Sequence, residues 1–166
     1  MIQLHRVPAS ADSALVAMAR TLVGEYAAMP HTAIRWPNAA ADIARLPEPF
    51  LPPSGLLLVV TDGDAPVGCG ALAAFDAPQV AEIKRVYVRA AARGRGIGET
   101  IMRALLAEAA RLGFERARLD TAPELIAAQE LYRRLGFVPI PHYRGTQLPG
   151  DLCFECDVAG FRHDAT

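Results

Sequence analysis

Apolar residues in the first half of the chain recur first with the period of a strand, then of a helix, then of strands again. Residues 2–7 predict a strand, and Ser10 is expected to cap a helix whose apolar side chains recur every three or four residues as far as Met29. The proline-rich stretch 31–55 predicts mostly loop, with a short helix near 42–46. Three further strands are expected at 56–61, 66–75 and 80–88, and a turn at 62–64 joins the first two as a β-hairpin.

In the second half, helical and strand patterns alternate. Apolar residues from Ile97 to Leu112 predict a helix that Gly113 ends, and Pro123 is expected to open another helix that Gly136 ends. Short strands are expected at 116–121, 137–140 and 152–158. This order predicts an α/β (α+β) fold, with a mixed, mostly antiparallel central sheet and helices on both faces, in a single domain over residues 1–166.

Composition and charge limit the classes of binding partner that the protein can have. The chain has 166 residues, 52% of them hydrophobic, and a formal net charge of −1. This balance argues against disorder and against nucleic acid or an anionic membrane surface as a partner. Residues 1–7 lack the apolar run of a signal peptide, and the longest aliphatic run, 56–60, is far shorter than the roughly 20 residues that span a membrane. We expect a soluble cytoplasmic protein, whose oligomeric state stays open, a homodimer included.

The three cysteines predict neither disulfides nor a metal site. Cys153 and Cys156 are spaced as in a zinc or redox motif, but they lie in an alternating stretch that predicts a strand. A strand would point the two sulfurs to opposite faces, and no second Cys or His pair follows at zinc spacing. We expect packing roles and no metal.

The segment after the strand 80–88 is the most informative part of the sequence. A basic, glycine-rich loop at 93–98 leads into the helix, which is expected to begin near Gly98. Glycines allow close approach of a ligand, and N–H groups that converge at a helix N-terminus bind anions. Arg93 and Arg95 add positive charge, so the loop predicts a phosphate or pyrophosphate site.

Three kinds of phosphate loop compete for this pattern. A Walker loop needs Lys followed by Ser or Thr after its last glycine, which is absent, and a dinucleotide loop needs glycine where Glu99 stands. The third pattern, Arg/Gln-x-x-Gly-x-Gly/Ala, is matched by Arg93, Gly96 and Gly98. The loop alone also fits a simple turn with two solvated arginines.

Three blocks in order and spacing resemble the GNAT acetyltransferase superfamily: the strand 82–88, the loop 93–98 and the segment 131–137. The resemblance implies a GNAT-like fold and an acyl donor, acetyl-CoA or a longer acyl-CoA. The pantetheine arm would lie where the strands 80–88 and 116–121 splay apart, and the pyrophosphate would lie on the loop. The implied cofactor-binding residues are Val86, Tyr87, Val88, Arg93, Gly94, Arg95, Gly96, Ile97 and Gly98.

The resemblance also implies two catalytic residues. Tyr132 matches the position that protonates the departing thiolate, although its helical spacing also fits a core tyrosine. Glu82 would relay a proton from the attacking amine, directly or through water; the alternative is a strand-end carboxylate that faces solvent or pairs with Lys84 or Arg85. The sequence departs from many members at Leu125, where they carry asparagine.

The implied activity is transfer of an acetyl group to a primary amine, within a complex of both substrates. A small-molecule acceptor is favoured, with protein or peptide N-acetylation as another option. A non-catalytic acyl-CoA-binding module, which Leu125 supports, and a dehydrogenase, which the hairpin at 56–75 disfavours, are the rivals. The expected acceptor-lining residues come from 25–36 and from the C-terminal hairpin: Glu25, Tyr26, His31, Arg35, Trp36, His142 and Tyr143.

Overall fold

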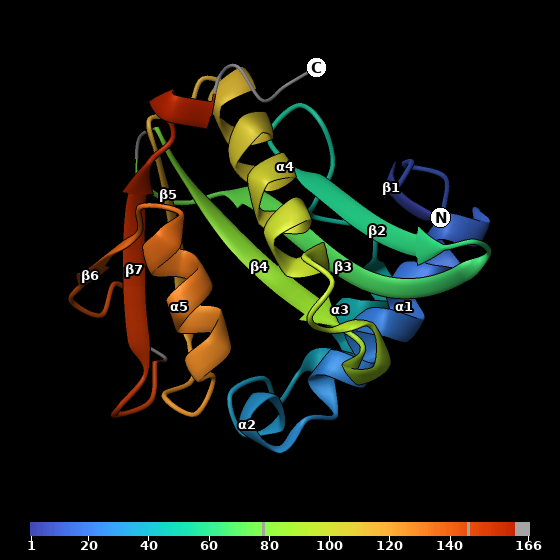
Figure 1. Cartoon of the computed structure of the whole chain (residues 1–166), viewed down its shortest axis with the longest axis horizontal. Helices are drawn as coiled ribbons and strands as arrows, with labels where there is room; N and C mark the ends of the chain where they lie inside the picture. Colours follow the sequence, from blue (N-terminus) through green and yellow to red (C-terminus); the bar gives the residue numbers. More distant parts are fainter. Residues whose placement is uncertain (78, 146, 162–166) are drawn as a thin grey trace.

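A seven-stranded sheet forms the middle layer of the molecule (Figure 1). The computed structural model describes residues 1–77, 79–145 and 147–161. The strands are β1 Ile2–Arg6, β2 Leu56–Asp62, β3 Ala65–Ala74, β4 Val80–Val88, β5 Arg116–Thr121, β6 Val138–Ile140 and β7 Leu152–Asp157. The helices are α1 Ala14–Ala27, α2 Pro30–Ala33, α3 Ala39–Arg45, α4 Ile97–Arg111 and α5 Ile126–Arg134, with 3₁₀ turns at Ala90–Ala92 and Ala159–Phe161.

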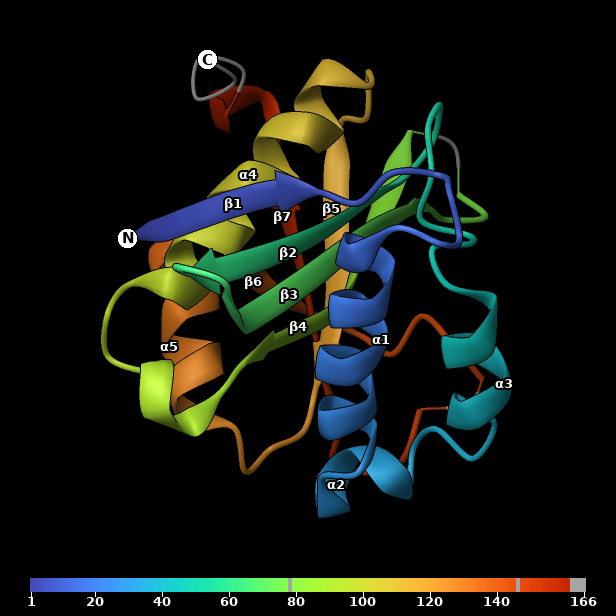
Figure 2. The same cartoon turned by 90° about the vertical axis from the view of Figure 1, so that its right-hand side faces the viewer.

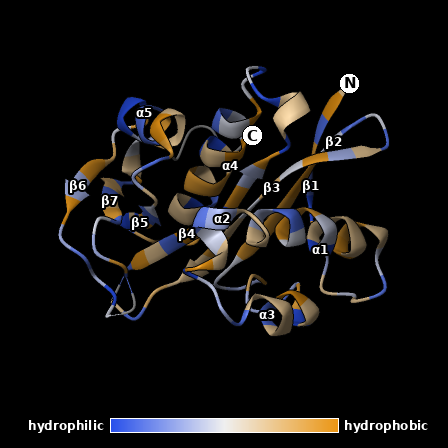
Figure 3. Cartoon of the chain, turned by 90° about the horizontal axis from the view of Figure 1, so that it is seen from below, coloured by the Kyte–Doolittle hydropathy of each residue, from blue (hydrophilic) through white to orange (hydrophobic). Residues whose placement is uncertain are grey.

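The sheet has the strand order β1-β2-β3-β4-β5-β7-β6, and every neighbouring pair is antiparallel except β4 and β5. Helices α4 and α5 cover one face, and α1, α2 and α3 lie on the other (Figures 2 and 3). The expected mixed, mostly antiparallel sheet between two helical layers is therefore confirmed. The expectation that 1–166 form a single domain stays a prediction, and residues 162–166 lie outside the described residues.

Both faces of the sheet are buried, which explains the continuous apolar run in β2. Leu56, Leu58 and Val60 pack in the core on the α4 side, whereas Leu57 and Val59 pack on the α1 side. Alternate side chains of a strand point to opposite faces, so a strand between two helical layers needs apolar residues at every position. Within the described ranges, no helix has the length and apolar character needed to cross a membrane.

Two predicted helix starts are wrong. The cap of α1 is Ser13, whose hydroxyl accepts from the Leu15 N–H at 3.2 Å, while Ser10 accepts a turn hydrogen bond from the Ser13 N–H. Helix α5 begins at Ile126 and not at Pro123, because residues 122–125 form a turn. The Gln129 amide stabilises that turn by donating to the carbonyls of residues 122 and 123.

The loop region 31–55 is more helical than its prolines suggested. Pro30 stands in the first turn of α2, where its missing N–H costs nothing, and α3 begins at Ala39, before the predicted 42–46. Helix α3 and the loop that follows it form one wall of the pocket described below.

The parallel pair β4–β5 separates after three residues. Val80–Glu82 pair with Arg116–Arg118, and beyond Glu82 the strand β4 has no ladder partner on the β5 side. The two ribbons meet at one end and diverge toward the other (Figure 1). Backbone N–H and C=O groups on this edge of β4 are therefore free to bind a ligand.

A bulge marks β4 beside this opening. Lys84 pairs with Ala71 of β3 and Tyr87 pairs with Cys69, so β4 has one more residue between these pairs than β3 has. Within the bulge, Arg85 adopts a left-handed φ of 58°. A bulge re-aims the side chains at its position. Lys84 and Arg85, although consecutive, both line the same pocket on the α1 side.

Candidate active site

The glycine-rich loop connects β4 to the N-terminus of α4. Gly94 and Gly96 each have φ 76°, and Gly96 is the residue before the first turn of α4. Left-handed backbone favours glycine, which explains both positions. A Cβ at either glycine would meet no atom within 4 Å, so the space in front of the loop is open. The free N–H groups of the first turn, from Ile97, and the helix dipole are the features with which a helix N-terminus binds an anion.

The two loop arginines contribute unequally. The Arg93 Nε donates to the carbonyl of Val88 at 3.0 Å, which holds the side chain beside the end of β4. Arg95 forms an ion pair with Asp62 at 2.8 Å, so its charge is shared with the β2–β3 hairpin. Arg93 is thus the better placed of the two to add to the positive potential of the loop.

The side chains of the predicted donor strand point to opposite faces. Val86 and Val88 pack toward α4, whereas Tyr87 packs toward α1 and its hydroxyl donates to Glu25 at 3.3 Å. Arg89 also binds Glu25, at 2.6 Å, and holds the pKa of that carboxyl below its ordinary value. The backbone of β4 is what faces the opening, and the Tyr87 side chain belongs to the cluster with Glu25.

Tyr132 lies on α5 with its ring in the core. The ring centroid is 5.8 Å from that of Phe137 and 6.1 Å from that of Phe154. Its hydroxyl has no hydrogen-bond partner among the described residues. Burial raises the pKa of Tyr132, and the nearby Tyr26 and Asp120 raise it further.

Glu82 is buried, with a side-chain exposure of 3%, and two cations hold it. Lys84 lies 2.9 Å away, and the guanidinium of Arg144, from the segment between β6 and β7, donates to both carboxylate oxygens. Burial raises the pKa of this carboxyl, but the hydrogen bonds and charges of Arg144 and Lys84 outweigh burial and lower it below the ordinary value. The structure thus shows the paired carboxylate, with Lys84 as expected and Arg144 as a partner that the sequence did not indicate.

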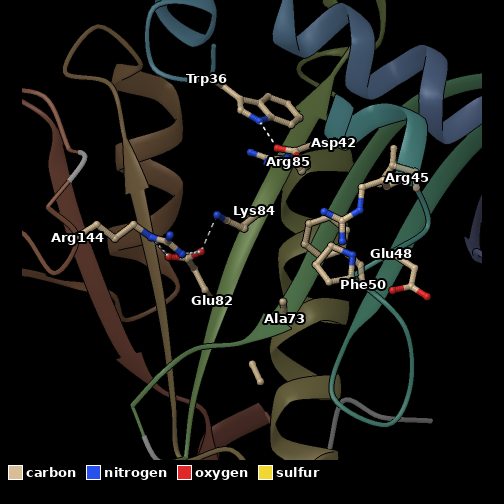
Figure 4. Close-up of a pocket in the computed structure, with 13 residues that line it drawn as sticks. Trp36, Asp42, Arg45, Glu48, Phe50, Ala73, Glu82, Lys84, Arg85 and Arg144 are labelled. Atoms are coloured by element: carbon tan, nitrogen blue, oxygen red, sulfur yellow. Dashed lines mark hydrogen bonds and ion pairs between the residues drawn. The ribbon is translucent and has the colours of Figure 1, made fainter. Parts of the chain in front are cut away.

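A pocket of about 290 Å³ lies on the α1 side of β4, between α3 with its following loop and the strands β3 and β4 (Figure 4). Trp36 and Phe50 form its aromatic walls, and Ala73 its floor on β3. Four cations and three carboxylates line it: Arg45, Lys84, Arg85 and Arg144, and Asp42, Glu48 and Glu82. The pocket and the glycine loop lie on opposite faces of β4.

Of the predicted acceptor residues, Trp36 lines this pocket. The indole N–H of Trp36 donates to Asp42 at 2.7 Å, and Arg35 is held by Asp151 at 2.6 Å. The remaining predicted residues, Glu25, Tyr26, His31, Arg35, His142 and Tyr143, do not line it. Sequence reasoning missed Asp42, Arg45, Glu48, Arg85 and Arg144; the only signal was the pair of charges at 84–85 within an apolar strand.

Leu125 and the cysteines add little to the chemistry. Leu125 precedes the first residue of α5 and gives no side-chain cap. Cys69, Cys153 and Cys156 are buried, and none of them forms a disulfide. Among the residues that the structure describes, no cluster of three His, Cys, Asp or Glu side chains could hold a metal ion.

Comparisons with known proteins identify the family. The sequence profile of the acetyltransferase (GNAT) family matches residues 17–137. An uncharacterized N-acetyltransferase of Schizosaccharomyces pombe is 31% identical over 142 residues, which cover 84% of this chain and 86% of that protein.

Solved structures agree on the fold. An acetyltransferase of Streptococcus agalactiae matches with a TM-score of 0.74 at 16% identity, covering 93% of this chain and 96% of that one. A GNAT acetyltransferase of Staphylococcus aureus matches with a TM-score of 0.73 at 15% identity, covering 95% and 99% of the two chains. The fold is that of the acyl-CoA N-acyltransferases. The chain belongs to the GNAT acetyltransferase family, and it is an N-acetyltransferase.

Proposed function

We propose that the enzyme transfers the acetyl group of acetyl-CoA to the primary amine of a small molecule, by direct attack within a complex of both substrates. One observation carries this proposal: the opening beside β4 separates an anion-binding loop on one face from a pocket of about 290 Å³ on the other. A donor and an acceptor can therefore approach the same strand edge from opposite sides.

The donor side fits acetyl-CoA. The left-handed Gly94 and Gly96 leave open space in front of the loop, and the first turn of α4 offers N–H groups for the pyrophosphate. The free edge of β4 at 86–88 offers backbone groups to the pantetheine arm. A longer acyl chain on the donor is the alternative at this site.

When bound, acetyl-CoA supplies the acetyl group as a thioester, whose carbonyl carbon bonds to the amine nitrogen as the C–S bond breaks. N–H groups of β4 at the opening would polarise the carbonyl. Tyr132 would donate its hydroxyl proton to the leaving sulfur. Burial raises the pKa of this tyrosine, so the hydroxyl carries its proton at neutral pH. Glu82 is a weak base with two cations bound, so its main role would be to hold Lys84 and Arg144 in place. The proton that the amine nitrogen loses as it is acylated would pass to water, from which Tyr132 would regain its own proton.

The acceptor side favours a small molecule over a protein or peptide tail. A volume of about 290 Å³ lies at the low end of ligand pockets, which span roughly 300–1,000 Å³. Protein or peptide N-acetylation is the second candidate. Cytoplasmic location remains a prediction.

The test is release of the CoA thiol from acetyl-CoA, measured with a panel of amino acids, polyamines, aminoglycosides and peptides. We expect at least one small amine to accelerate thiol release and to yield an equal amount of N-acetylated product. If acetyl-CoA stabilises the protein against heat and yet no amine accelerates thiol release, the proposal is wrong.

A further inference from the structure

Arg85 is a partly buried cation without an anionic partner. Its guanidinium has neither a hydrogen bond nor an ion pair to any residue that the structure describes, although Glu82, Lys84 and Arg144 beside it are fully paired with one another. Its guanidinium carbon lies 3.3 Å from the ring centroid of Trp36. The carboxylates of Asp42 and Glu82 act on this charge, but neither forms an ion pair with it. A partly desolvated cation without a direct anionic contact is unfavourable, so this arrangement needs a reason.

Stacking on Trp36 orients the guanidinium but leaves its N–H groups unused. An aromatic face attracts a cation through the ring quadrupole, whereas the N–H donors of arginine lie in its plane and point past the ring. The Trp36 ring is itself fixed by its hydrogen bond to Asp42 (Figure 4). Burial lowers the pKa of the Arg85 guanidinium, as expected for a poorly compensated charge. The N–H groups of the Arg85 guanidinium, which form a planar fork, are therefore oriented to bind a planar anion.

The missing anion does not come from the acyl donor. The loop that fits the pyrophosphate, 93–98, follows the far end of β4, and its strand neighbours Val86 and Val88 face α4. Arg85 faces the opposite side, in the pocket with Trp36 and Phe50. Arg45 at the same pocket is exposed and also has no ion pair within the described ranges, so the lining carries one more cation than carboxylates.

We propose that the acceptor is a small amino acid or a similar amine that carries a carboxylate, and that Arg85, stacked on Trp36, binds this carboxylate. The inference rests on the proposed acetyl transfer and names its substrate class. The carboxylate would take both N–H groups of the Arg85 fork, Arg45 would add charge at the mouth, and Trp36 and Phe50 would contact the apolar part. The amine is left to reach the opening beside β4, where the backbone of Arg85 itself lies.

The first experiment compares acceptors that differ only in the carboxylate. Alanine, leucine and phenylalanine are each assayed against their amides and their decarboxylated amines, with rates corrected for the fraction of unprotonated amine. We expect the acids to be preferred by about tenfold to a hundredfold in kcat/KM, as for a charge-assisted bidentate contact. The amides mimic a protein N-terminus, so a preference for amides would overturn the inference in favour of a peptide acceptor.

The second experiment does not depend on catalysis. Trp36 is the only tryptophan of the chain, so its fluorescence reports on this pocket directly. We expect N-acetylleucine, in the presence of CoA, to change the fluorescence saturably, and N-acetylleucinamide to have little effect. Arg85→Gln should abolish the response and the preference for acids, and Arg85→Lys should restore part of both. Arg134→Gln, which removes an exposed charge on α5, is the matched control and should retain both.

The outcomes separate the two proposals. Turnover of neutral amines without any preference for acids overturns the carboxylate inference and leaves acetyl transfer standing. Absence of turnover with every amine overturns the proposed function, and the fluorescence titration then still decides whether the pocket binds carboxylates. Should Arg85→Gln fail to fold, the wild-type acid, amide and amine series and the Arg45→Gln variant decide between binding and no binding of the carboxylate.

Discussion

On the α4 side of β4 a ligand meets mainly backbone N–H groups, whereas on the α1 side it meets charged side chains. The loop 93–98 keeps its shape through two left-handed glycines and the start of α4. The pocket keeps its shape through the ion pairs of Glu82 with Lys84 and Arg144. Backbone groups recognise a pyrophosphate whatever the neighbouring side chains are, while side chains can change without disturbing the strand. On the proposed function, donor binding therefore depends on the backbone fold, whereas acceptor choice depends on exchangeable side chains.

The largest effect should come from Tyr132, the proposed proton donor on α5. Tyr132→Phe removes only the hydroxyl, which has no partner among the described residues, so the free energy of unfolding should change little. We expect kcat to fall by roughly 10²–10⁴ if the hydroxyl protonates the thiolate, while acetyl-CoA still binds. Steady-state kinetics measures the loss, and thermal shift with acetyl-CoA measures binding.

An acyl donor with a more acidic thiol is the control for Tyr132→Phe. Such a thiol leaves without help, so the loss in kcat should shrink with that donor. Because burial raises the pKa of Tyr132, wild-type kcat should also show no loss from tyrosine ionisation up to about pH 10. A Tyr132→Phe enzyme with near-normal kcat on its best acceptor would identify this residue as part of the core only.

The next largest effect should come from the backbone of the loop. Gly96→Val places a branched side chain in the open space before α4 and at a φ of 76° that it rarely adopts. We expect loss of the thermal stabilisation by acetyl-CoA, which is worth about 2.7 kcal/mol at a hundredfold excess over its dissociation constant. NADH and ATP should stabilise the wild type much less.

Gly113→Val is the matched control for the loop. Gly113 follows α4 at its other end with φ 88°, so the substitution introduces similar backbone strain far from the loop. It should lower the melting temperature and keep the shift with acetyl-CoA. Equal loss of the shift in both variants would mean that strain, and not the loop, controls donor binding.

The same contrast explains what the sequence could reveal. Strands β4 and β5 have the predicted bounds, and Gly113 follows α4 as predicted. These features could be predicted because hydrophobic periodicity and turn residues are properties of a short stretch of sequence. The loop 93–98 was equally accessible, since its residues are contiguous. The predicted helix starts at Ser10 and Pro123 are wrong because each residue lies in a turn before the helix. Hydrogen bonds of later residues, Leu15 and Gln129, determine where each turn ends.

The pocket could not be predicted in this way. It joins the segment 36–50, the strands β3 and β4, and Arg144, which lie far apart in the chain and meet only when the sheet has formed. The direction of Arg85 depends on a bulge opposite Cys69, and no local pattern encodes that register shift. Most of the expected acceptor residues lie outside this pocket for this reason, since they were chosen by segment and not by face.

A smaller effect on activity should follow from changing Glu82. With Lys84 and Arg144 bound to it, its pKa is already lowered, and a weak base removes few protons from an amine. We expect Glu82→Gln to lower kcat/KM by no more than about tenfold. The kcat/KM of the variant should still rise with pH, because the acceptor amine loses its proton as the pH rises. A fall of a hundredfold together with a changed pH profile would assign the general base to Glu82.

The smallest effect should appear in acid stability, for which Glu108 is the counterpart of Glu82. Like Glu82, Glu108 on α4 is buried and pairs with two cations. Its partners are Arg6 at 2.9 Å and Arg111 at 2.7 Å. The hydrogen bond of Arg111 above all lowers its pKa from 4.5 to about 2. Such a fall corresponds to at most about 3 kcal/mol, and the exposure of both arginines reduces it to about 1–2 kcal/mol.

Both carboxyls have lowered pKa values in the folded state, so both stabilise the fold fully above their ordinary pKa and lose this contribution as the pH falls through the folded value. Glu108→Gln should therefore lower the free energy of unfolding by about 1–2 kcal/mol at pH 7, and the difference from wild type should vanish between pH 4.5 and about 2. Urea unfolding at a series of pH values measures both variants. Only Glu82→Gln should also alter the kinetics of the acceptor, because Glu108 lies outside the pocket. If Glu108→Gln changes the acceptor KM as much as Glu82→Gln does, acceptor binding responds to general stability and is not confined to the α1 side of β4.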